Sequence, residues 1–381
     1  MWQDKIDSSF FDVCINNAQE DNCIVFVNDF YQSKDALDSL GIEIVNGYPF
    51  INAFCVQAPN ISKLIKLANL HIVDYISRVN TASVLMNKTN HIVRVDMLHR
   101  LGLYGRGVGV AIIDTGCHPH LDFMLAHSKD IVFVDMINKR NCMYDDNGHG
   151  TFVCGVLAGS GYSSGGVYKG VAPECGLVVI KALDKDGHAR GIKILDAMQW
   201  VLSNKQKYNI KVLCMSFGSE PMSQFDALSI GASSLWDSGI TVVSAVGNDG
   251  PKIGSIKSPA MARKIISVGC LDAQSSPYKI ADFSSRGPIF DITKPDIVSP
   301  GVDVVSLSNS LDIFCKMSGT SVSTPVVAGI CALLLEYSPK LSPNDLKAVL
   351  LNGAIPISNE VNAEGMGLLD ALNCLYSIKH D

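Results

Sequence analysis

The sequence predicts an α/β protein with a doubly wound, mainly parallel sheet, preceded by a small α+β domain. From about residue 105, near-continuous apolar runs alternate with helical stretches, a pattern typical of a parallel sheet covered by helices on both faces. Before about residue 86 the strand-like and helical runs follow the order βαββαβ, which suits a small sheet with two helices on one face. We therefore expect two domains, residues 1–86 and 87–381.

The individual elements follow from hydrophobic periodicity and turn residues. In the small domain we expect strands at 23–27, 42–45, 53–56 and 73–76, and helices at 33–40 and 61–70. In the larger domain we expect strands at 108–113, 177–180, 212–217, 241–246 and 265–268, and helices at 151–158, 192–204, 225–237 and 326–335. A site in such a sheet is expected beyond the carboxyl ends of the strands.

Composition argues against several classes of partner. The net charge is −6 and no Lys/Arg cluster occurs, so we expect no nucleic-acid partner. The longest apolar run, 326–335, is too short to span a bilayer, so we expect no membrane partner. Residues 1–7 do not resemble a signal peptide, and the twelve cysteines lack a metal-ligand spacing, which predicts free thiols in the cytoplasm.

Three residues stand at the ends of predicted elements in a way that suggests chemistry. Asp114 directly follows an apolar strand, His149 lies between two glycines at the start of a helix, and Ser321 precedes the apolar helix that contains Pro325. We expect Pro325 in the first turn of that helix, where its missing N–H does no harm. Each residue has a structural alternative: Asp forms turns, a histidine is often part of the packing, and Ser caps helices.

The order Asp, His, Ser resembles that of the subtilisin family of serine proteases. The segments that match its motifs are 111–116, 149–151 and 319–321 with Pro325. The resemblance implies that Ser321 is the nucleophile, that His149 is the general base and that Asp114 orients the imidazole. It also implies an oxyanion hole formed by the side chain of Asn248 and the backbone N–H of Ser321.

The resemblance further implies three segments that bind an extended peptide by backbone pairing. Two segments enclose the primary pocket, and the third forms the opposing edge. Because these segments are small and apolar, we expect a hydrophobic side chain before the cleaved bond. The residues are Ser216, Phe217 and Gly218; Ala245, Val246 and Gly247; and, at the opposing edge, Gly187, His188 and Ala189.

Residues 1–86 resemble the propeptide of the family, a domain that assists folding and inhibits the enzyme as a partner of its cleft. Processing is then expected near Leu85 or Met86. The alternative is a permanent accessory domain. Segments 144–150 and 294–297 are most similar to the intracellular bacterial branch of the family.

The sequence departs from the family pattern near the histidine. Phe152 replaces a second histidine, and Cys154 lies on the predicted helix of His149, with Cys117 close to Asp114 in the sequence. Thiol reagents are therefore expected to inhibit if these cysteines are reactive, and inert packing is the alternative. No cofactor is required, and calcium is a candidate structural ion with Asp122 as a candidate ligand, although the 159–166 loop lacks an oxygen-ligand pattern.

The predicted function is that of a serine endopeptidase, made as an autoprocessed zymogen and acting on peptide or protein substrates. The alternative is a non-cleaving pseudoprotease that uses the same groove as a binding scaffold. An α/β-hydrolase esterase is disfavoured because the sequence has no Gly-x-Ser-x-Gly elbow and the order of the triad differs.

Overall fold

The computed structural model divides the chain into two units, Met1–Ser83 and Val84–Asp381, which we call the N-terminal and C-terminal units. It describes residues 5–6, 22–57, 60–78, 88–124, 131–221, 223, 225–310 and 313–378. The processing site expected near Leu85 or Met86 lies outside the described residues. The two units are considered separately below.

The N-terminal unit is a four-stranded sheet with the order β2-β3-β1-β4, and it has its own hydrophobic core. Strand β1 pairs antiparallel with both β3 and β4, and β2 pairs antiparallel with β3. Helix α2 begins earlier than expected because Asp29 accepts hydrogen bonds from the backbone of Tyr31 and Gln32. The elements are β1 (Asn22–Val27), α2 (Phe30–Ser39), β2 (Ile44–Tyr48), the 3₁₀ turn η2 (Pro49–Ile51), β3 (Ala53–Gln57), α3 (Ile61–Ala68) and β4 (Val73–Arg78).

The C-terminal unit contains an eight-stranded sheet whose central strand is β5 (Gly109–Asp114), with every residue buried. The path of the sheet is β11-β10-β9-β8-β5-β7-β6, and β12 also pairs with β10. All pairs are parallel except β10 with β11. The other strands are β6 (Ile131–Asp135), β7 (Gly176–Lys181), β8 (Ile210–Met215), β9 (Thr241–Ala245), β10 (Ile266–Asp272), β11 (Lys279–Ile280) and β12 (Ile297–Pro300).

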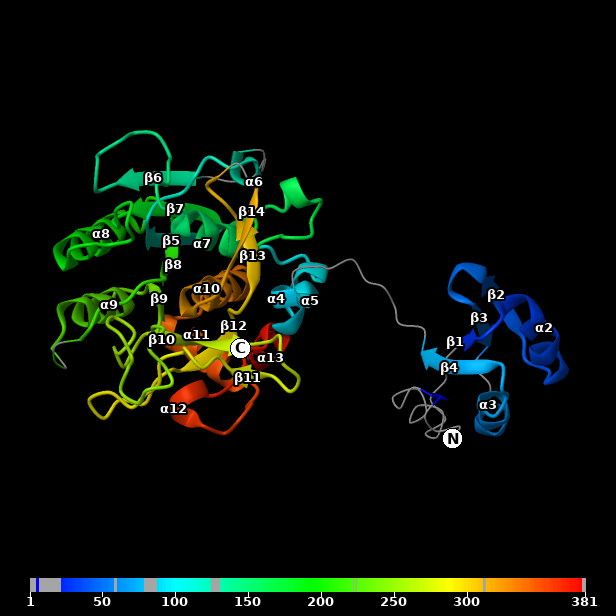
Figure 1. Ribbon diagram of the computed structural model, residues 1–381. Helices are drawn as coiled ribbons and strands as arrows, with labels where there is room; N and C mark the ends of the chain where they lie inside the picture. The colour runs from blue at the N-terminus through cyan, green and yellow to red at the C-terminus, as the bar shows by residue number, and fades with distance from the viewer. Residues whose placement is uncertain are drawn as a thin grey trace. The chain divides into compact units, whose positions relative to one another are not determined.

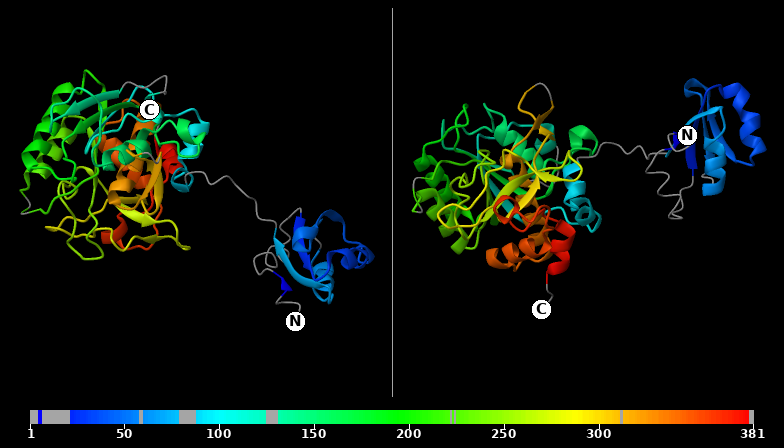
Figure 2. Two further views of the ribbon diagram at one scale, coloured as in Figure 1. Left: turned by 45° about the horizontal axis from the view of Figure 1, so that its top comes forward. Right: turned by 60° about the horizontal axis from the view of Figure 1, so that its bottom comes forward.

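Helices cover both faces of this sheet, as the alternating pattern predicts. Helices α8 (Gly191–Asn204) and α9 (Ala227–Asp237) lie on one side, and α7 (His149–Ala158) and α10 (Thr320–Tyr337) lie on the other (Figure 1). The left view of Figure 2 shows the orange helix α10 inside the unit, where it packs against α7 and several strands. The chain leaves β5 for β6 and β7 on one side and then crosses to β8, β9 and β10 on the other, so the carboxyl end of β5 is a switch point.

The remaining elements lie around this sheet. Helix α11 has a capping box in which Ser342 and Asp345 bond each other's backbone, a signal readable in the sequence. The elements are α4 (Lys88–Ile92), α5 (Val95–Arg100), α6 (Leu121–Met124), η3 (Tyr162–Ser164), α11 (Pro343–Gly353), α12 (Val361–Glu364), α13 (Ala371–Ser377) and the separate hairpin β13 (Val304–Leu307) and β14 (Phe314–Met317).

Helix α10 differs from its expected form. It begins at Thr320, well before the apolar run, so Pro325 lies inside the helix rather than in its first turn. The small, mostly polar residues 320–324 continue the helix because four of the five, including Val322, are buried against the core. The helix has the length and hydropathy of a membrane span, but 83% of its 18 residues are buried inside the unit, as in a core helix.

Candidate active site

Asp114 and His149 meet at the carboxyl end of the central strand. Asp114 is fully buried, and its Oδ1 accepts hydrogen bonds from His149 Nδ1 at 2.8 Å and from the Thr115 backbone N–H at 2.7 Å. Its Oδ2 is buried and has no hydrogen-bond partner among the described residues. The carboxylate therefore directs its charge at the imidazole, which fixes the orientation of the ring and leaves Nε2 for chemistry.

This close approach depends on glycine. A Cβ at Gly150 would collide with the Gly116 carbonyl oxygen and would lie 3.1 Å from Asp114 Oδ1. Gly148 has φ +108° and precedes the first residue of α7. A side chain at either position would move the start of α7, and with it His149, away from the strand.

The electrostatics favour a basic imidazole. Burial lowers the pKa of His149, but the charge of Asp114, its hydrogen bond and the charge of Asp145 together outweigh burial, so the pKa lies above its ordinary value. Since the side chain retains 28% exposure, a substrate can reach the ring.

Asp145 holds the loop that precedes His149, a role that our sequence analysis missed. Its two carboxylate oxygens accept hydrogen bonds from the Thr115 hydroxyl, the backbone of Asn147 and Gly148, and both the backbone and hydroxyl of Thr151, at 2.6–3.1 Å. Burial raises its pKa, yet these donors outweigh burial and the pKa is lowered. The signal is present in the sequence, because an Asp at the start of a short polar segment such as Asp145-Asp146-Asn147-Gly148 before a helix is typical of a side chain that bonds its own turn.

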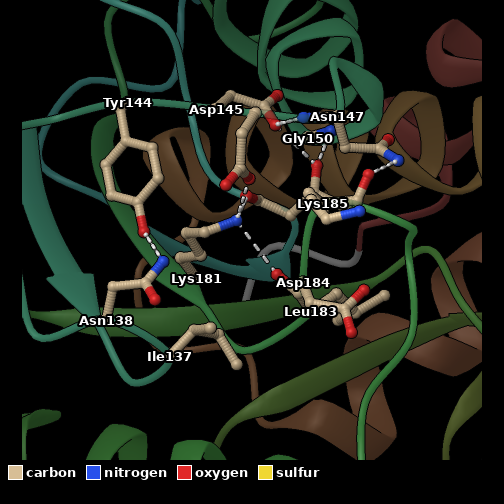
Figure 3. Close-up of polar contacts among 12 residues, drawn as sticks. Ile137, Asn138, Tyr144, Asp145, Asn147, Gly150, Lys181, Leu183, Asp184 and Lys185 are labelled. Carbon is tan, nitrogen blue, oxygen red and sulfur yellow. Dashed lines mark hydrogen bonds and ion pairs between the residues drawn. The ribbon is translucent and has the colours of Figure 1, made fainter.

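Lys181, the last residue of β7, connects this strand to the same loop. Figure 3 shows its side chain reaching toward the loop. The buried ammonium donates to the Thr115 carbonyl, to Asp146 Oδ1 at 2.6 Å and to the Leu183 carbonyl at 3.1 Å. Asn147 donates to the Lys185 carbonyl at 3.0 Å, which joins the loop to the segment that continues toward Gly187. No local pattern identifies Lys181, because its importance depends on contacts distant in the sequence.

Ser321 and Asn248 lie close together at the start of α10, which packs against α7, the helix that begins with His149. Ser321 lies in the first turn of α10, where backbone N–H groups have no acceptor within the helix. The residue before the helix is Gly319 and no side chain caps it, so the alternative of a capping serine is wrong. Asn248 follows β9, and its Oδ1 accepts from the Thr320 backbone N–H at 2.9 Å, which identifies this atom as oxygen.

That bond turns the Asn248 amide nitrogen toward the nucleophile. A Cβ built on Gly319 would lie 3.1 Å from Ser321 Oγ and 3.3 Å from Asn248 Nδ2, so both atoms face the same small space. A donor and a hydroxyl on one side of a glycine, with the positive end of a helix behind them, can hold and attack a carbonyl group. Among the described residues, we find no hydrogen bond to the Ser321 hydroxyl.

Comparisons with known proteins identify the family of the chain. A family model described as the subtilase family matches residues 105–370. The chain belongs to the subtilase family. It is 38% identical over 297 residues to serine protease AprX of Bacillus subtilis, a match covering 71% of this chain and 66% of AprX. Thus the chain spans slightly less than two thirds of the length of AprX.

Two further relatives place the fold. Subtilisin Savinase of Lederbergia lenta is 33% identical over 279 residues, covering 73% of this chain and 94% of that protein. The crystal structure of a cold adapted subtilisin-like serine proteinase has a TM-score of 0.59 and 26% identity, and covers 73% of this chain and 91% of that chain. The doubly wound α/β fold expected from the sequence is confirmed.

The residues expected to bind substrate fall into two places in this subtilase. Gly187, His188 and Ala189 line a pocket of about 610 Å³ together with Phe217 and Gly218. Its remaining lining is largely apolar and comes from 183–195, Ser219 and 226–228. Ser216 is buried beside Cys214 rather than in this pocket.

The 245–247 segment has its side chains inside the protein. Ala245 and Val246 are buried, and Val246 belongs to a small cluster with Ile256 and Met261, so only the backbone and Gly247 face outward. The expectation that these residues would line a pocket with small side chains therefore applies to Gly247 alone.

Asp122, the candidate calcium ligand, holds the 159–166 loop through hydrogen bonds. It is fully buried, and its two carboxylate oxygens accept the backbone N–H groups of Gly161 at 2.7 Å and Ser163 at 2.9 Å. Because these two donors already stabilise the buried carboxylate, the loop does not require an ion at Asp122. In the described part of the chain, no group of three or more His, Cys, Asp or Glu side chains is placed to hold a metal.

The two cysteines near the histidine are buried thiols. Cys117 and Cys154 have no exposed surface, and Cys154 lies on α7 as expected. Burial, a hydrogen bond with Cys117 and nearby negative charge raise the pKa of Cys154 well above its ordinary value. Since the thiolate is the reactive form, this favours the packing alternative. No disulfide joins the cysteines of the described ranges.

Proposed function

We propose that this chain is a serine endopeptidase that hydrolyses peptide bonds through an acyl-enzyme. The observation that carries the proposal is the 2.8 Å bond between Asp114 and His149, together with the packing of α7, which begins with His149, against α10, whose first turn contains Ser321. His149 takes the proton of Ser321 as the hydroxyl attacks the carbonyl carbon, and then passes it to the leaving amine. Water, activated by the same histidine, releases the acyl group.

Asn248 and the Ser321 backbone N–H stabilise the oxyanion that forms during attack. The two hydrogen bonds between Thr320 and Asn248 Oδ1 hold the amide before substrate arrives, which supports this role. Asn248→Ala is expected to lower kcat by about 10²–10³-fold with little change in KM, because the donor acts on charge present only in the transition state. Steady-state kinetics on a peptide anilide measure this effect, and a variant in which KM rises while kcat stays unchanged would contradict it.

An extended peptide that pairs with 187–189 and 216–218 would place a side chain in the 610 Å³ pocket. Its largely apolar lining, including Leu183, Ile192 and Phe217, supports selection of a large apolar residue there.

The N-terminal unit acts as an inhibitory propeptide, and the chain is an autoprocessed zymogen. A separate sheet with its own core supports a role as an independently folding domain. The cytoplasmic location stays a prediction. A protease in that compartment would need an inhibitor that prevents it from cleaving other proteins. Deleting residues 1–86 is expected to impair folding or raise activity, and a deletion that does neither would refute the inhibitory role.

The first test compares the wild-type chain with Ser321→Ala by intact mass and by peptide hydrolysis. A wild-type chain that shortens near residue 86 and cleaves peptide, beside an inert full-length variant, supports the proposal. If neither chain shortens nor cleaves, the binding-scaffold alternative is favoured. Cleavage by Ser321→Ala at the wild-type rate would mean that another residue is the nucleophile.

A further inference from the structure

The two segments that leave β8 and β9 lie side by side next to the nucleophile. Strands β8 and β9 are parallel neighbours, so the 216–218 and 245–247 segments emerge from the same edge of the sheet. The Gly247 backbone N–H donates to the Thr320 hydroxyl at 3.2 Å, and Asn248 follows directly. The substrate residue whose carbonyl group is held by Asn248 and attacked by Ser321 therefore has its side chain close to Gly247.

Lys257 lies between these two segments. Its backbone N–H donates to the Val246 carbonyl at 2.9 Å. The next residue, Ser258, exchanges two backbone hydrogen bonds of 2.9 Å with Ser219. The backbone of 257–258 thus bridges the two segments and fixes where the Lys257 side chain begins.

The stem of Lys257 fills the space in front of both glycines. A Cβ at Gly218 would lie 2.6 Å from Lys257 Cβ, and a Cβ at Gly247 would lie 2.5 Å from Lys257 Cγ. Both distances are shorter than real carbon contacts, so the lysine stem already occupies the volume that a side chain at either glycine would need.

The ammonium of Lys257 is held at both sides. It forms ion pairs with Glu220 and with Asp249, one after each of the two segments. Its side chain is 12% exposed, whereas those of Glu220 and Asp249 are 75% and 55% exposed. Burial lowers the pKa of Lys257, but the two carboxylates outweigh burial and raise it, so the group stays charged. Moving the stem aside would break two charge-assisted bonds while a substrate covers the site.

We propose that Lys257 is a specificity-determining residue that restricts the pocket beside Ser321 to small side chains of the substrate residue preceding the cleaved bond. The inference rests on the proposed peptidase function and replaces the hydrophobic preference expected from sequence. Alanine or serine fits in front of Gly247, whereas an aromatic ring would need the volume of the lysine stem. Selection for large apolar groups is left to the 610 Å³ pocket.

The test measures kcat/KM for three acylated tripeptide anilides that end in Ala, Phe or Glu and are otherwise identical. The wild-type enzyme is expected to prefer Ala. Lys257→Ala is expected to raise the Phe/Ala ratio by at least about 10–200-fold, the range that a single methylene group is worth in a hydrophobic pocket. Lys257→Met keeps the bulk of the side chain without its charge, and its Phe/Ala ratio is expected to stay within about threefold of the wild-type ratio. Lys252→Ala removes an exposed lysine of the same loop and is expected to change nothing.

Binding provides a readout that does not need catalysis. Calorimetry with Ser321→Ala, alone and combined with Lys257→Ala, uses the acylated tripeptides ending in Ala or Phe as probes. Only the double variant is expected to bind the Phe peptide as tightly as the Ala peptide. Anilide cleavage with an unchanged Phe/Ala ratio in Lys257→Ala overturns the inference and leaves the peptidase function intact.

Other results overturn the inference in different ways. A wild-type preference for Phe means that the stem moves aside. A wild-type preference for Glu means that the ammonium, and not the stem, reads the substrate. An absence of cleavage by every variant refutes the peptidase function, and the calorimetric comparison then tests the role of Lys257 by itself. If Ser321→Ala and the double variant discriminate equally between the Phe and Ala peptides, or if neither variant binds a peptide, the proposed role of Lys257 is overturned.

Discussion

At the scale of single residues, the carboxylate of Asp114 determines how basic His149 is. Its charge and its hydrogen bond are the largest effects that raise the pKa of the imidazole. The general base must be neutral, so activity is lost as pH falls through this raised pKa, and the acid limb should lie above the ordinary value of a histidine.

Asp114→Asn is therefore expected to lower kcat by about 10⁴-fold, because an amide neither stabilises the imidazolium nor selects the correct tautomer. The acid limb should also move to lower pH, since the pKa of His149 falls without the carboxylate. A profile of kcat/KM against pH measures both effects. An acid limb that stays in place would show that Asp114 does not act on His149.

The sequence reveals Asp114, His149, Asn248 and Ser321 because each stands in a short motif at the end of a predicted element. Lys257 carries no such signal, since Ile256-Lys257-Ser258 reads like any surface turn. Its position becomes apparent only when two separate strand ends come together around it.

At the scale of elements, the loop that ends at His149 depends on Asp145. Asp145→Asn leaves a backbone or hydroxyl donor facing an NH₂ group, so we expect a stability loss of about 1–3 kcal/mol and a fall in kcat larger than the change in KM. The lowered pKa of Asp145 means that its contribution is present above the unfolded value of 3.8 and is lost as pH falls through the folded value.

Urea unfolding at several pH values tests this prediction. The difference between wild type and Asp145→Asn should be largest near neutral pH and should shrink in acid. Asp303→Asn, which removes an exposed carboxylate paired only with Lys316, serves as the control and should change stability little. A difference that stays constant with pH would contradict the role of the charge.

The side chain of Asp122 holds the 159–166 loop. Because Asp122 accepts two backbone N–H groups there, removal of calcium with a chelator is expected to leave Tm unchanged. Asp122→Asn is expected to lower stability by about 1–3 kcal/mol, because one donor loses its acceptor. Thermal unfolding with and without chelator measures both, and a fall in Tm on chelation would contradict this account.

Sequence patterns located the elements better than their ends. The start of α10 differs from the expected one because its first residues are mostly polar, and polar residues signal a loop unless tertiary contacts bury them. By contrast, α11 has a capping box at Ser342 and Asp345 that local chemistry alone identifies.

At the scale of the whole molecule, hydrophobic patterning predicted two separate cores and a parallel sheet, because burial on both faces requires continuous apolar strands. Patterning does not reveal charges buried between elements. Asp296 is one: Oδ2 accepts from Lys294 at 2.6 Å, and Oδ1 lies 2.9 Å from Lys347 of α11.

Asp296 directly precedes β12, bonds Ser267 of β10 and pairs with Lys347 of α11. Loss of this cluster should therefore destabilise the whole C-terminal unit. Burial lowers the pKa of Lys294 to about 8 despite the charge of Asp296, while the two lysines outweigh burial and lower the pKa of Asp296. Asp296 thus stabilises the fold at pH values above its unfolded pKa, and this contribution is lost as pH falls through its lower folded value.

Asp296→Asn leaves the buried ammonium of Lys294 and the partly buried ammonium of Lys347 without their counter-charge. We expect a loss of about 3–5 kcal/mol in the free energy of unfolding at neutral pH, because an uncompensated buried charge costs more than the pair contributes. Asp237→Asn is the matched control, since it breaks an exposed pair with Lys264 and should cost less than about 1 kcal/mol. Urea midpoints of both variants, measured in the inactive Ser321→Ala background to prevent self-cleavage, compare the two pairs directly. Equal losses would mean that burial does not strengthen this cluster, whereas the larger loss for Asp296→Asn identifies it as a determinant of the stability of the unit that carries the triad.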